Sequence, residues 1–258
     1  MADKDLLYQV ADQVATITIN RKANRNTISP EAIALFQEYL DRAEEDDAIR
    51  VVCVTGAGEK AFCSGADLAG GLGGDADSRA HIERYARLIS RLAAFPKPTV
   101  ARINGYCLAG GTGFMLGCDI VIAKASAKFG TPEVNVGLFP MMIGALIFRN
   151  VPRKKAMEMI LLGEKLTADQ ALEMGLVTRV VPDAEFEPAT QDVLQAIAAK
   201  SPVGMRIGKA AFAAVEEMPL EEAVLYLGAQ LAKVAATEDA KEGIIAFLEK
   251  RAPRFTGK

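Results

Sequence analysis

Apolar positions near the start of the chain follow two different periods. The β-branched run Val14–Ile19 predicts a β-strand, and the nearly continuous apolar run 49–54 predicts a second strand that is buried on both faces of a sheet. Between these strands, apolar residues recur at helical spacing over 33–43. We expect this helix to begin at Ser29, whose side chain can cap it, with Pro30 in its first turn.

The same alternation continues through the middle of the chain. Apolar residues at helical spacing over 82–92 predict a second amphipathic helix, which the Pro96–Pro98 segment ends. Further strands are predicted at 99–103 and 120–123, with a helix between them that follows the small-residue segment 108–113. Strands that alternate with helices are typical of a mainly parallel sheet with helical crossovers.

Helices dominate the pattern in the last third of the chain. Thr167 and Gln170 form a predicted capping box, and Ser201 is a start signal for the helical tail that follows. Asp239 and Glu242 are interpreted as a second capping box within that tail. A helical tail of this kind often packs on a neighbouring chain.

Composition narrows the class of protein. The 258 residues are 50% hydrophobic, but no apolar run approaches the roughly 20 residues that a membrane-spanning helix needs. The formal net charge of -3 provides no general attraction for nucleic acid or anionic lipid. Four cysteines without CxxC spacing and one histidine do not favour a zinc site, so we expect reduced thiols and no metal. Asp3 and Asp5 stand where a signal peptide would be basic and then apolar, and we therefore expect a cytoplasmic protein.

Two glycine-containing turns, each after a predicted strand, are the strongest candidates for chemistry. They span 61–68, with the sequence AFCSGADL, and 104–111, with the sequence NGYCLAGG. Turns of this composition let backbone N–H groups point into a cavity, and a helix after the second turn adds positive potential. Two such donors can form an oxyanion hole, worth about 3 to 4 kcal/mol per donor in the transition state. Both segments can equally be tight structural turns, and composition alone leaves the two interpretations open.

The order and spacing of these and other segments resemble the crotonase (enoyl-CoA hydratase/isomerase) superfamily. The similarity covers nearly the whole chain, and each motif is weak alone, whereas their joint order is specific. The matching segments, in chain order, are 20–21 with Asn26, 61–68, 97–105, 118–120, 129–140, 162–164, 168–171, 175–177 and 247–251.

The resemblance implies an α/β fold, a crotonase-like spiral of ββα units with a C-terminal helical trimerisation region. It implies a core with the acyl-CoA site over residues 1–200 and a helical C-terminal region over 201–258. The implied partners are an acyl-CoA thioester as substrate and further copies of the chain, in a homotrimer or a dimer of trimers. Coenzyme A is part of the substrate, so no separate cofactor is expected.

Catalytic roles are implied for three residues. The backbone N–H groups of Ala66 and Gly110 correspond to the two oxyanion donors, and Glu133 corresponds to the second of the family's catalytic glutamates. The first glutamate falls at Gly113, where this chain has no carboxylate. A third position, used as an acid in dienoyl-CoA isomerases, falls at Met141 and is also changed.

The resemblance also implies a set of substrate-binding positions around these groups. They are Ser64, Gly65, Asp67, Leu68, Gly113, Met141 and, as a candidate for a coenzyme A phosphate, Arg25. The coenzyme A chain is expected to lie along the first of the two turns. Because Met141 and its apolar neighbours replace the Gly-rich turn usual at this point, a more apolar wall is expected in the acyl pocket.

A single carboxylate limits the number of possible reactions but does not select one of them. Moving a double bond from the β,γ to the α,β position needs one base, which takes a proton from the α-carbon and returns it to the γ-carbon through an enolate. Glu133 alone can do this, and burial between apolar walls would raise its pKa toward neutrality. Hydration stays open, because Gly113 leaves space for a water that Glu133 could activate. Decarboxylation, thioester hydrolysis and binding without catalysis are further alternatives.

A dinucleotide-binding oxidoreductase is the alternative from another class. The segment 56–61, GAGEKA, follows a predicted strand and fits G-x-G-x-x-A. A Rossmann turn opens a helix, however, whereas a second turn follows here, so the context argues against this hypothesis. A Ser-His-Asp hydrolase would need the single histidine, His81, which we expect to be solvated, and Ser64 lies outside a G-x-S-x-G elbow.

Overall fold

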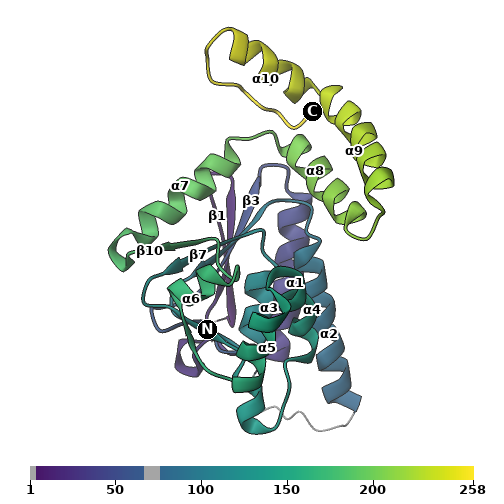
Figure 1. The fold of residues 1–258 in the computed structure, drawn as a ribbon. Helices are drawn as coiled ribbons and strands as arrows, with labels where there is room; N and C mark the ends of the chain where they lie inside the picture. Colours follow the sequence, from purple (N-terminus) through teal and green to yellow (C-terminus); the bar gives the residue numbers. More distant parts are fainter. Residues whose placement is uncertain (1–3, 67–75) are drawn as a thin grey trace.

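Two β-sheets and the helices that connect them form the body of the protein (Figure 1). The computed structural model describes residues 4–66 and 76–258. The larger sheet has the strand order β1-β2-β3-β5-β7-β10, antiparallel between β1 and β2 and parallel elsewhere. Its strands are β1 (Leu6–Ala11), β2 (Val14–Ile19), β3 (Val51–Gly56), β5 (Thr99–Ile103), β7 (Ile120–Lys124) and β10 (Arg179–Val181).

The smaller sheet has the order β4-β6-β8-β9, parallel except between β8 and β9. Its strands are β4 (Ala61–Cys63), β6 (Tyr106–Leu108), β8 (Lys128–Gly130) and β9 (Leu166–Thr167). Three successive units give their first strand to the larger sheet and their second to the smaller one, and each then continues into a helix. These units are β3-β4-α2, β5-β6-α3 and β7-β8-α4. The arrangement is the spiral of ββα units that the sequence predicted.

Helices cover the sheets and continue beyond them at the C-terminal end. They are α1 (Pro30–Glu45), α2 (Ala76–Ala93), α3 (Gly110–Leu116), α4 (Met141–Asn150), α5 (Arg153–Leu162), α6 (Ala168–Glu173), α7 (Phe186–Ala198), α8 (Pro202–Val215), α9 (Leu220–Ala235) and α10 (Glu238–Leu248), with the 3₁₀ turns η1 (Lys22–Asn24), η3 (Pro132–Val136) and η4 (Asp183–Glu185). In Figure 1, α8, α9 and α10 form an arm that projects from the sheets. The division between 1–200 and 201–258 stays a prediction, with α8 beginning just after it. In the part of the chain that the structure describes, no helix is long and apolar enough to cross a membrane.

The larger sheet is buried on both faces, as the apolar run over β3 predicted. Val52 and Val54 pack into the core shared with α1 and α2, whereas Val51 and Cys53 pack toward α7 on the other face. Alternation along the strand sends successive side chains to opposite faces. Burying an aliphatic side chain of this size stabilises the fold by about 1.5 to 3 kcal/mol, so both layers hold the sheet that supports the site.

The predicted helix starts at Ser29, Thr167 and Ser201 are confirmed by their hydrogen bonds. The Ala32 N–H donates to the Ser29 hydroxyl oxygen over 3.0 Å at the start of α1. Thr167 and Gln170 form the predicted capping box at the start of α6. Caps of this kind contribute about 1 kcal/mol each, because they satisfy N–H groups that a helix start leaves without partners.

The predicted capping box at Asp239 and Glu242 is wrong. Thr237 caps α10 instead, and its hydroxyl oxygen accepts from the Ala240 N–H over 3.1 Å. Asp239 is buried and accepts hydrogen bonds from the Ser201 hydroxyl and from the backbone of the C-terminal tail. The carboxylate therefore ties the tail to the start of α8, a contact that local spacing does not reveal.

Candidate functional site

Three neighbouring parallel strands of the smaller sheet place the candidate site. These strands, β4, β6 and β8, lie in that order and end at the same edge of the sheet. The segment after β4 contains Ala66, the segment after β6 contains Gly110, and the segment after β8 contains Glu133. Because the carboxyl ends of adjacent parallel strands meet, the three sequence-predicted groups are gathered from distant parts of the chain.

The two glycine-containing turns are in direct contact. A Cβ atom built on Gly65 would lie 2.8 Å from the Ala109 Cβ and 3.3 Å from the Gly110 nitrogen. A Cβ built on Gly110 would lie 3.6 Å from the Ala66 nitrogen. The backbone amides of Ala66 and Gly110 therefore lie side by side, as an oxyanion hole requires.

Neither of these two N–H groups is used in the hydrogen bonds of its own strand or helix. Ala66 forms a parallel bridge with Ile28, in which the Ile28 N–H donates to the Gly65 oxygen over 2.9 Å. Because the Ile28 N–H bonds to the residue before Ala66, the N–H of Ala66 itself faces the other side of the strand, away from Ile28. Gly110 is the first residue of α3, where an N–H has no acceptor within the helix.

Unusual backbone conformations hold the turns in this arrangement. Gly65 has φ +103°, a region that residues with a side chain rarely adopt. Ala109 has φ 50° and ψ −130°, and such a conformation persists only where surrounding contacts enforce it. One of these contacts is the hydrogen bond from the Ala109 N–H to the Gly130 oxygen, over 3.0 Å, which ties the second turn to the end of β8.

Glu133 carries a half-buried carboxyl group on η3. Its Oε2 atom is buried and has no hydrogen-bond partner among the residues that the structure describes. Burial raises the pKa of this carboxyl, and a hydrogen bond from its own backbone N–H opposes the shift only in part. A desolvated, unpaired carboxyl oxygen is costly for folding, and perturbed groups of this kind concentrate at functional sites.

The chain is similar to known proteins over nearly its whole length. The family model described as enoyl-CoA hydratase/isomerase matches residues 9–258. The chain belongs to this family. It is 37% identical to (E)-benzylidenesuccinyl-CoA hydratase of Thauera aromatica, over 96% of this chain and 98% of the relative. It is also 37% identical to 1,2-epoxyphenylacetyl-CoA isomerase of Escherichia coli (strain K12), over 98% of both chains.

A crystal structure of enoyl-CoA hydratase from Bacillus anthracis matches the fold with a TM-score of 0.94. The two sequences are 32% identical, and the match covers 98% of this chain and 100% of the other. These comparisons confirm the crotonase fold and the family predicted from the sequence. They also confirm the prediction of an acyl-CoA enzyme of the hydratase or isomerase type.

Gly113 does not offer the space for water that the sequence led us to expect. A Cβ built on this residue would lie 2.5 Å from the Tyr85 hydroxyl oxygen and 2.7 Å from the Ile143 Cγ2. The Ile89 Cγ2 follows at 3.3 Å. Side chains from α2 and α4 fill this face of α3, because they pack into the room that the missing side chain leaves. The position of the family's first glutamate is thus closed and mostly apolar.

Tyr85 is the site residue that sequence reasoning missed. On the pattern of α2 it is one more apolar position, and the structure buries its ring against Phe114 in an edge-to-face contact of 5.4 Å. Its hydroxyl donates to the Gly110 oxygen over 2.5 Å. The residue type could have indicated this role, because the hydroxyl of a buried tyrosine usually has a hydrogen-bond partner.

The first turn also brings Ser64 and Arg25 together. The Ser64 hydroxyl donates to the Arg25 backbone oxygen over 2.9 Å, so the arginine lies beside the start of the turn. Arg25 itself has φ 52° and is exposed. Asp67 and Leu68, predicted to follow the coenzyme A chain, lie outside the described residues.

Met141, the third of the three positions named from the resemblance, lies at the surface. It begins α4, and its side chain is 74% exposed. The neighbouring side chains of Leu138 and Phe139 are also exposed. In the single chain these residues form an apolar surface next to η3, whereas the closed wall near Gly113 comes from α2 and from deeper residues of α4.

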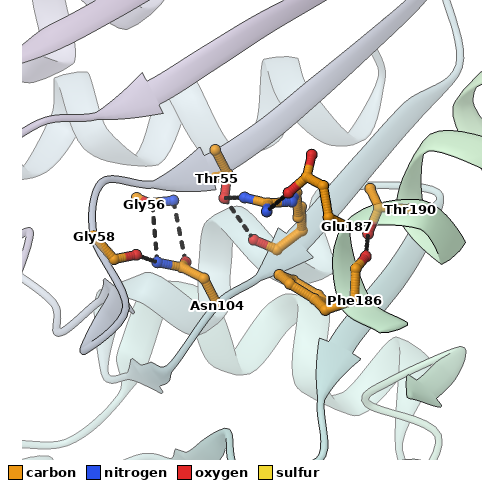
Figure 2. A network of polar contacts seen from close by, with 8 residues as sticks. Thr55, Gly56, Gly58, Asn104, Phe186, Glu187 and Thr190 are labelled. Atoms are coloured by element: carbon orange, nitrogen blue, oxygen red, sulfur yellow. Dashed lines mark hydrogen bonds and ion pairs between the residues drawn. The ribbon is translucent and has the colours of Figure 1, made fainter. Parts of the chain in front are cut away.

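The turn after β3 is a structural support for the site (Figure 2). The Asn104 amide donates to the Gly56 and Gly58 oxygens, over 2.9 Å and 2.5 Å, and its oxygen accepts from the Gly56 N–H. The chain then enters β4 and not a helix. This observation confirms that the G-x-G-x-x-A spacing is no Rossmann turn. Figure 2 also shows Glu187 of α7 in the same region. Its carboxylate forms an ion pair with Arg102.

Other reactive side chains do not form a second catalytic group here. Burial raises the pKa of the Cys63 thiol to about 12, so it stays protonated beside the first turn. His81 is half-buried, and the expectation of a solvated side chain is wrong, because its Nδ1 is buried without a hydrogen-bond partner in the described chain. Burial lowers its pKa. Over residues 4–66 and 76–258, no three potential metal ligands group together.

Proposed function

We propose that this enzyme moves a double bond within the acyl group of a coenzyme A thioester, from the β,γ to the α,β position. Glu133 is the single base, and the enolate oxygen is held by the N–H groups of Ala66 and Gly110. The observation that carries the proposal is the unpaired, buried Glu133 oxygen at the strand ends that also present these two donors.

The proposed reaction returns every proton and electron pair to the substrate. The Glu133 carboxylate takes a proton from the α-carbon, and the electron pair moves into the thioester carbonyl. The resulting enolate oxygen lies between the two N–H groups, which stabilise its charge by about 3 to 4 kcal/mol each. The protonated Glu133 then gives its proton to the γ-carbon, as the double bond forms between the α- and β-carbons. A raised pKa suits this group, because it acts first as a base and then as an acid.

Coenzyme A is proposed to bind along the first turn, at Ser64 and Gly65, with Arg25 as a cation for a phosphate. The hydrogen bond between the Ser64 hydroxyl and the Arg25 oxygen supports this arrangement, because it brings the turn and the arginine together. The proposed acyl pocket is bounded by the side chains that cover Gly113 and by the apolar surface at Met141. Coenzyme A belongs to the substrate, and the proposal includes no separate cofactor or metal.

Hydration is the competing reaction, and the face at Gly113 argues against it. Adding water to the β-carbon needs a group that holds and activates that water. The space at Gly113 contains the Tyr85 hydroxyl and two isoleucine side chains, and Gly113 itself carries no carboxylate. Isomerisation needs only the proton transfer that Glu133 can provide, so the geometry favours it.

Two matched substrates test the proposal. We expect the purified enzyme to increase the conjugated-thioester absorbance of a β,γ-unsaturated acyl-CoA and to leave that of the α,β-unsaturated isomer largely unchanged. The reason is that the enzyme can shift the double bond with one base but lacks a second group for water. Loss of absorbance from the α,β-unsaturated isomer, with formation of a hydroxyacyl-CoA, would establish hydration and overturn the isomerase assignment.

We also propose that the chain assembles as a homotrimer or a dimer of trimers through its C-terminal arm. Large apolar side chains on α9 and α10 are more than half exposed in the single chain. They are Leu220, Val224, Leu225, Leu231, Ile244, Phe247 and Leu248. An apolar surface of this extent is unusual on a monomer and typical of a protein–protein interface.

Changing Phe247, which is 82% exposed, to glutamate tests the assembly. We expect Phe247→Glu to shift the sedimentation-equilibrium mass from a trimer or its multiple toward the monomer, because burying an unpaired charge in the interface is costly. A wild-type protein that sediments as a monomer would contradict the proposal.

A further inference from the structure

Tyr85 links helix α2 to the start of helix α3, next to the proposed oxyanion donor, the Gly110 N–H. It comes from α2, and its hydroxyl donates to the backbone oxygen of Gly110, the first residue of α3. The Tyr85 hydroxyl oxygen would lie 3.2 Å from a Cβ built on Gly110 and 2.5 Å from a Cβ built on Gly113. Residues three apart share a helix face, so the hydroxyl covers the face of α3 next to the Gly110 amide.

The start of α3 has few restraints of its own. No side chain caps the helix, and the preceding residue, Ala109, has a left-handed φ of 50°. Gly110 lacks a side chain that would limit its torsion angles. The hydrogen bond from Tyr85 to the Gly110 oxygen fixes the peptide group that follows Gly110. The peptide group that precedes it carries the Gly110 N–H, and its Ala109 oxygen accepts from the Thr112 N–H over 2.9 Å. The two hydrogen bonds together keep the Gly110 N–H in one direction.

We propose that Tyr85 is a positioning residue that aims the Gly110 N–H at the thioester oxygen. The inference rests on the proposed function, because it gives the Gly110 N–H its role. The tyrosine proton is engaged by the Gly110 oxygen, so Tyr85 acts through the backbone and not as a donor to the substrate.

The electrostatic surroundings keep Tyr85 in the protonated form that this role needs. Burial raises its pKa well above the usual value, and the nearby Cys63, Cys107 and Glu133 raise it further. Only the neutral hydroxyl can donate to the Gly110 oxygen. The hydrogen bond therefore persists over the pH range in which Glu133 works as a base.

The test compares two tyrosines that each donate to a backbone oxygen from a buried position. Tyr85→Phe removes the bond to Gly110 and keeps the ring that packs on Phe114. Tyr39→Phe is the matched control, since Tyr39 donates to the Leu6 oxygen over 3.4 Å on another helix, α1. We expect Tyr85→Phe to lower kcat by about 10-fold with KM within about 2-fold, because a misdirected donor loses mainly transition-state stabilisation. Tyr39→Phe should leave both constants unchanged.

A second readout reports the carbonyl directly and needs no turnover. Dimethylaminocinnamoyl-CoA absorbs at longer wavelength when hydrogen bonds polarise its thioester carbonyl. We expect a red shift with the wild-type enzyme and with Tyr39→Phe, and a smaller shift with Tyr85→Phe at saturating ligand. If Tyr85→Phe keeps the full red shift and the wild-type kcat, the positioning role is overturned and the proposed function stands. If the bound ligand shows no red shift even in the wild type, the oxyanion hole itself is overturned, and the inference falls with it.

Discussion

Replacing Glu133 by glutamine is expected to lower kcat by about 10²- to 10⁴-fold, the usual contribution of a positioned acid–base group. Glutamine keeps the size and shape of the side chain but cannot accept the α-proton. The affinity for coenzyme A should change little, because the proposed contacts with it lie on the first turn, at Ser64, Gly65 and Arg25. Steady-state kinetics with the β,γ-unsaturated substrate and direct titration of the bound ligand separate the two effects.

The control for this variant is Glu164→Gln, which changes an exposed glutamate in the segment after α5. It makes the same chemical change outside the site and should leave kcat unaltered. Burial disfavours the ionised Glu133 in the folded protein, so a raised carboxyl pKa means that stability falls as the pH rises through it. Glu133→Gln removes this cost, and we expect no lower Tm at neutral pH. Full activity of Glu133→Gln would remove the carboxyl from the mechanism.

The same raised pKa sets the direction of the pH dependence. The first step needs the carboxylate, so kcat/KM should fall as the pH decreases through the pKa of Glu133 in the free enzyme. Because burial raises this pKa, the fall is expected at a pH above the value of about 4.3 for a solvated glutamate. The measurement is the pH profile of kcat/KM. If the fall at low pH disappears in Tyr85→Phe but persists in Glu133→Gln, it belongs to a group other than Glu133.

The sequence predicted those elements whose own side chains carry a periodic signal. The strands β2 and β5 were predicted with their observed bounds, and α1 and β7 were predicted within a few residues. The strands β4, β6 and β8 span three residues each, which is too short for alternation to appear. β4 and β6 were included only within the two predicted turns, and β8 was not predicted as a strand, although the ends of these three strands gather the site.

Parts of the candidate site could likewise be predicted from a local sequence pattern, and other parts could not. Backbone groups such as the Ala66 and Gly110 amides were predicted, because glycine-containing turns leave a local pattern and the family resemblance gave them order. The filling of the space at Gly113 could not be predicted in this way. It depends on Tyr85 and Ile143, which lie on separate helices and meet only after the sheets have formed. Tyr85 therefore looked like an ordinary core position.

Gly65→Ala is expected to have the next largest effect, a loss of about 10²- to 10³-fold in kcat, as when one oxyanion donor is removed. The new Cβ would lie 2.8 Å from the Ala109 Cβ and 3.3 Å from the Gly110 nitrogen, so the two turns must separate. Their separation moves the Ala66 and Gly110 amides apart. The red shift of bound dimethylaminocinnamoyl-CoA should decrease together with kcat.

Gly58→Ala is the control, because it also places alanine at a positive φ but causes no collision. Gly58 has φ +76°, and a Cβ there would make ordinary contact with the Lys22 side chain at 3.5 Å. Both substitutions place alanine at a positive φ and are expected to lower Tm, Gly65→Ala by more because of the collision with Ala109. If Gly58→Ala loses stability but keeps kcat, whereas Gly65→Ala loses kcat while it is still folded, the effect belongs to the spacing of the two amides. Equal losses of kcat would instead trace it to general destabilisation, and an unchanged kcat in Gly65→Ala would show that the contact between the turns does not set the geometry of the donors.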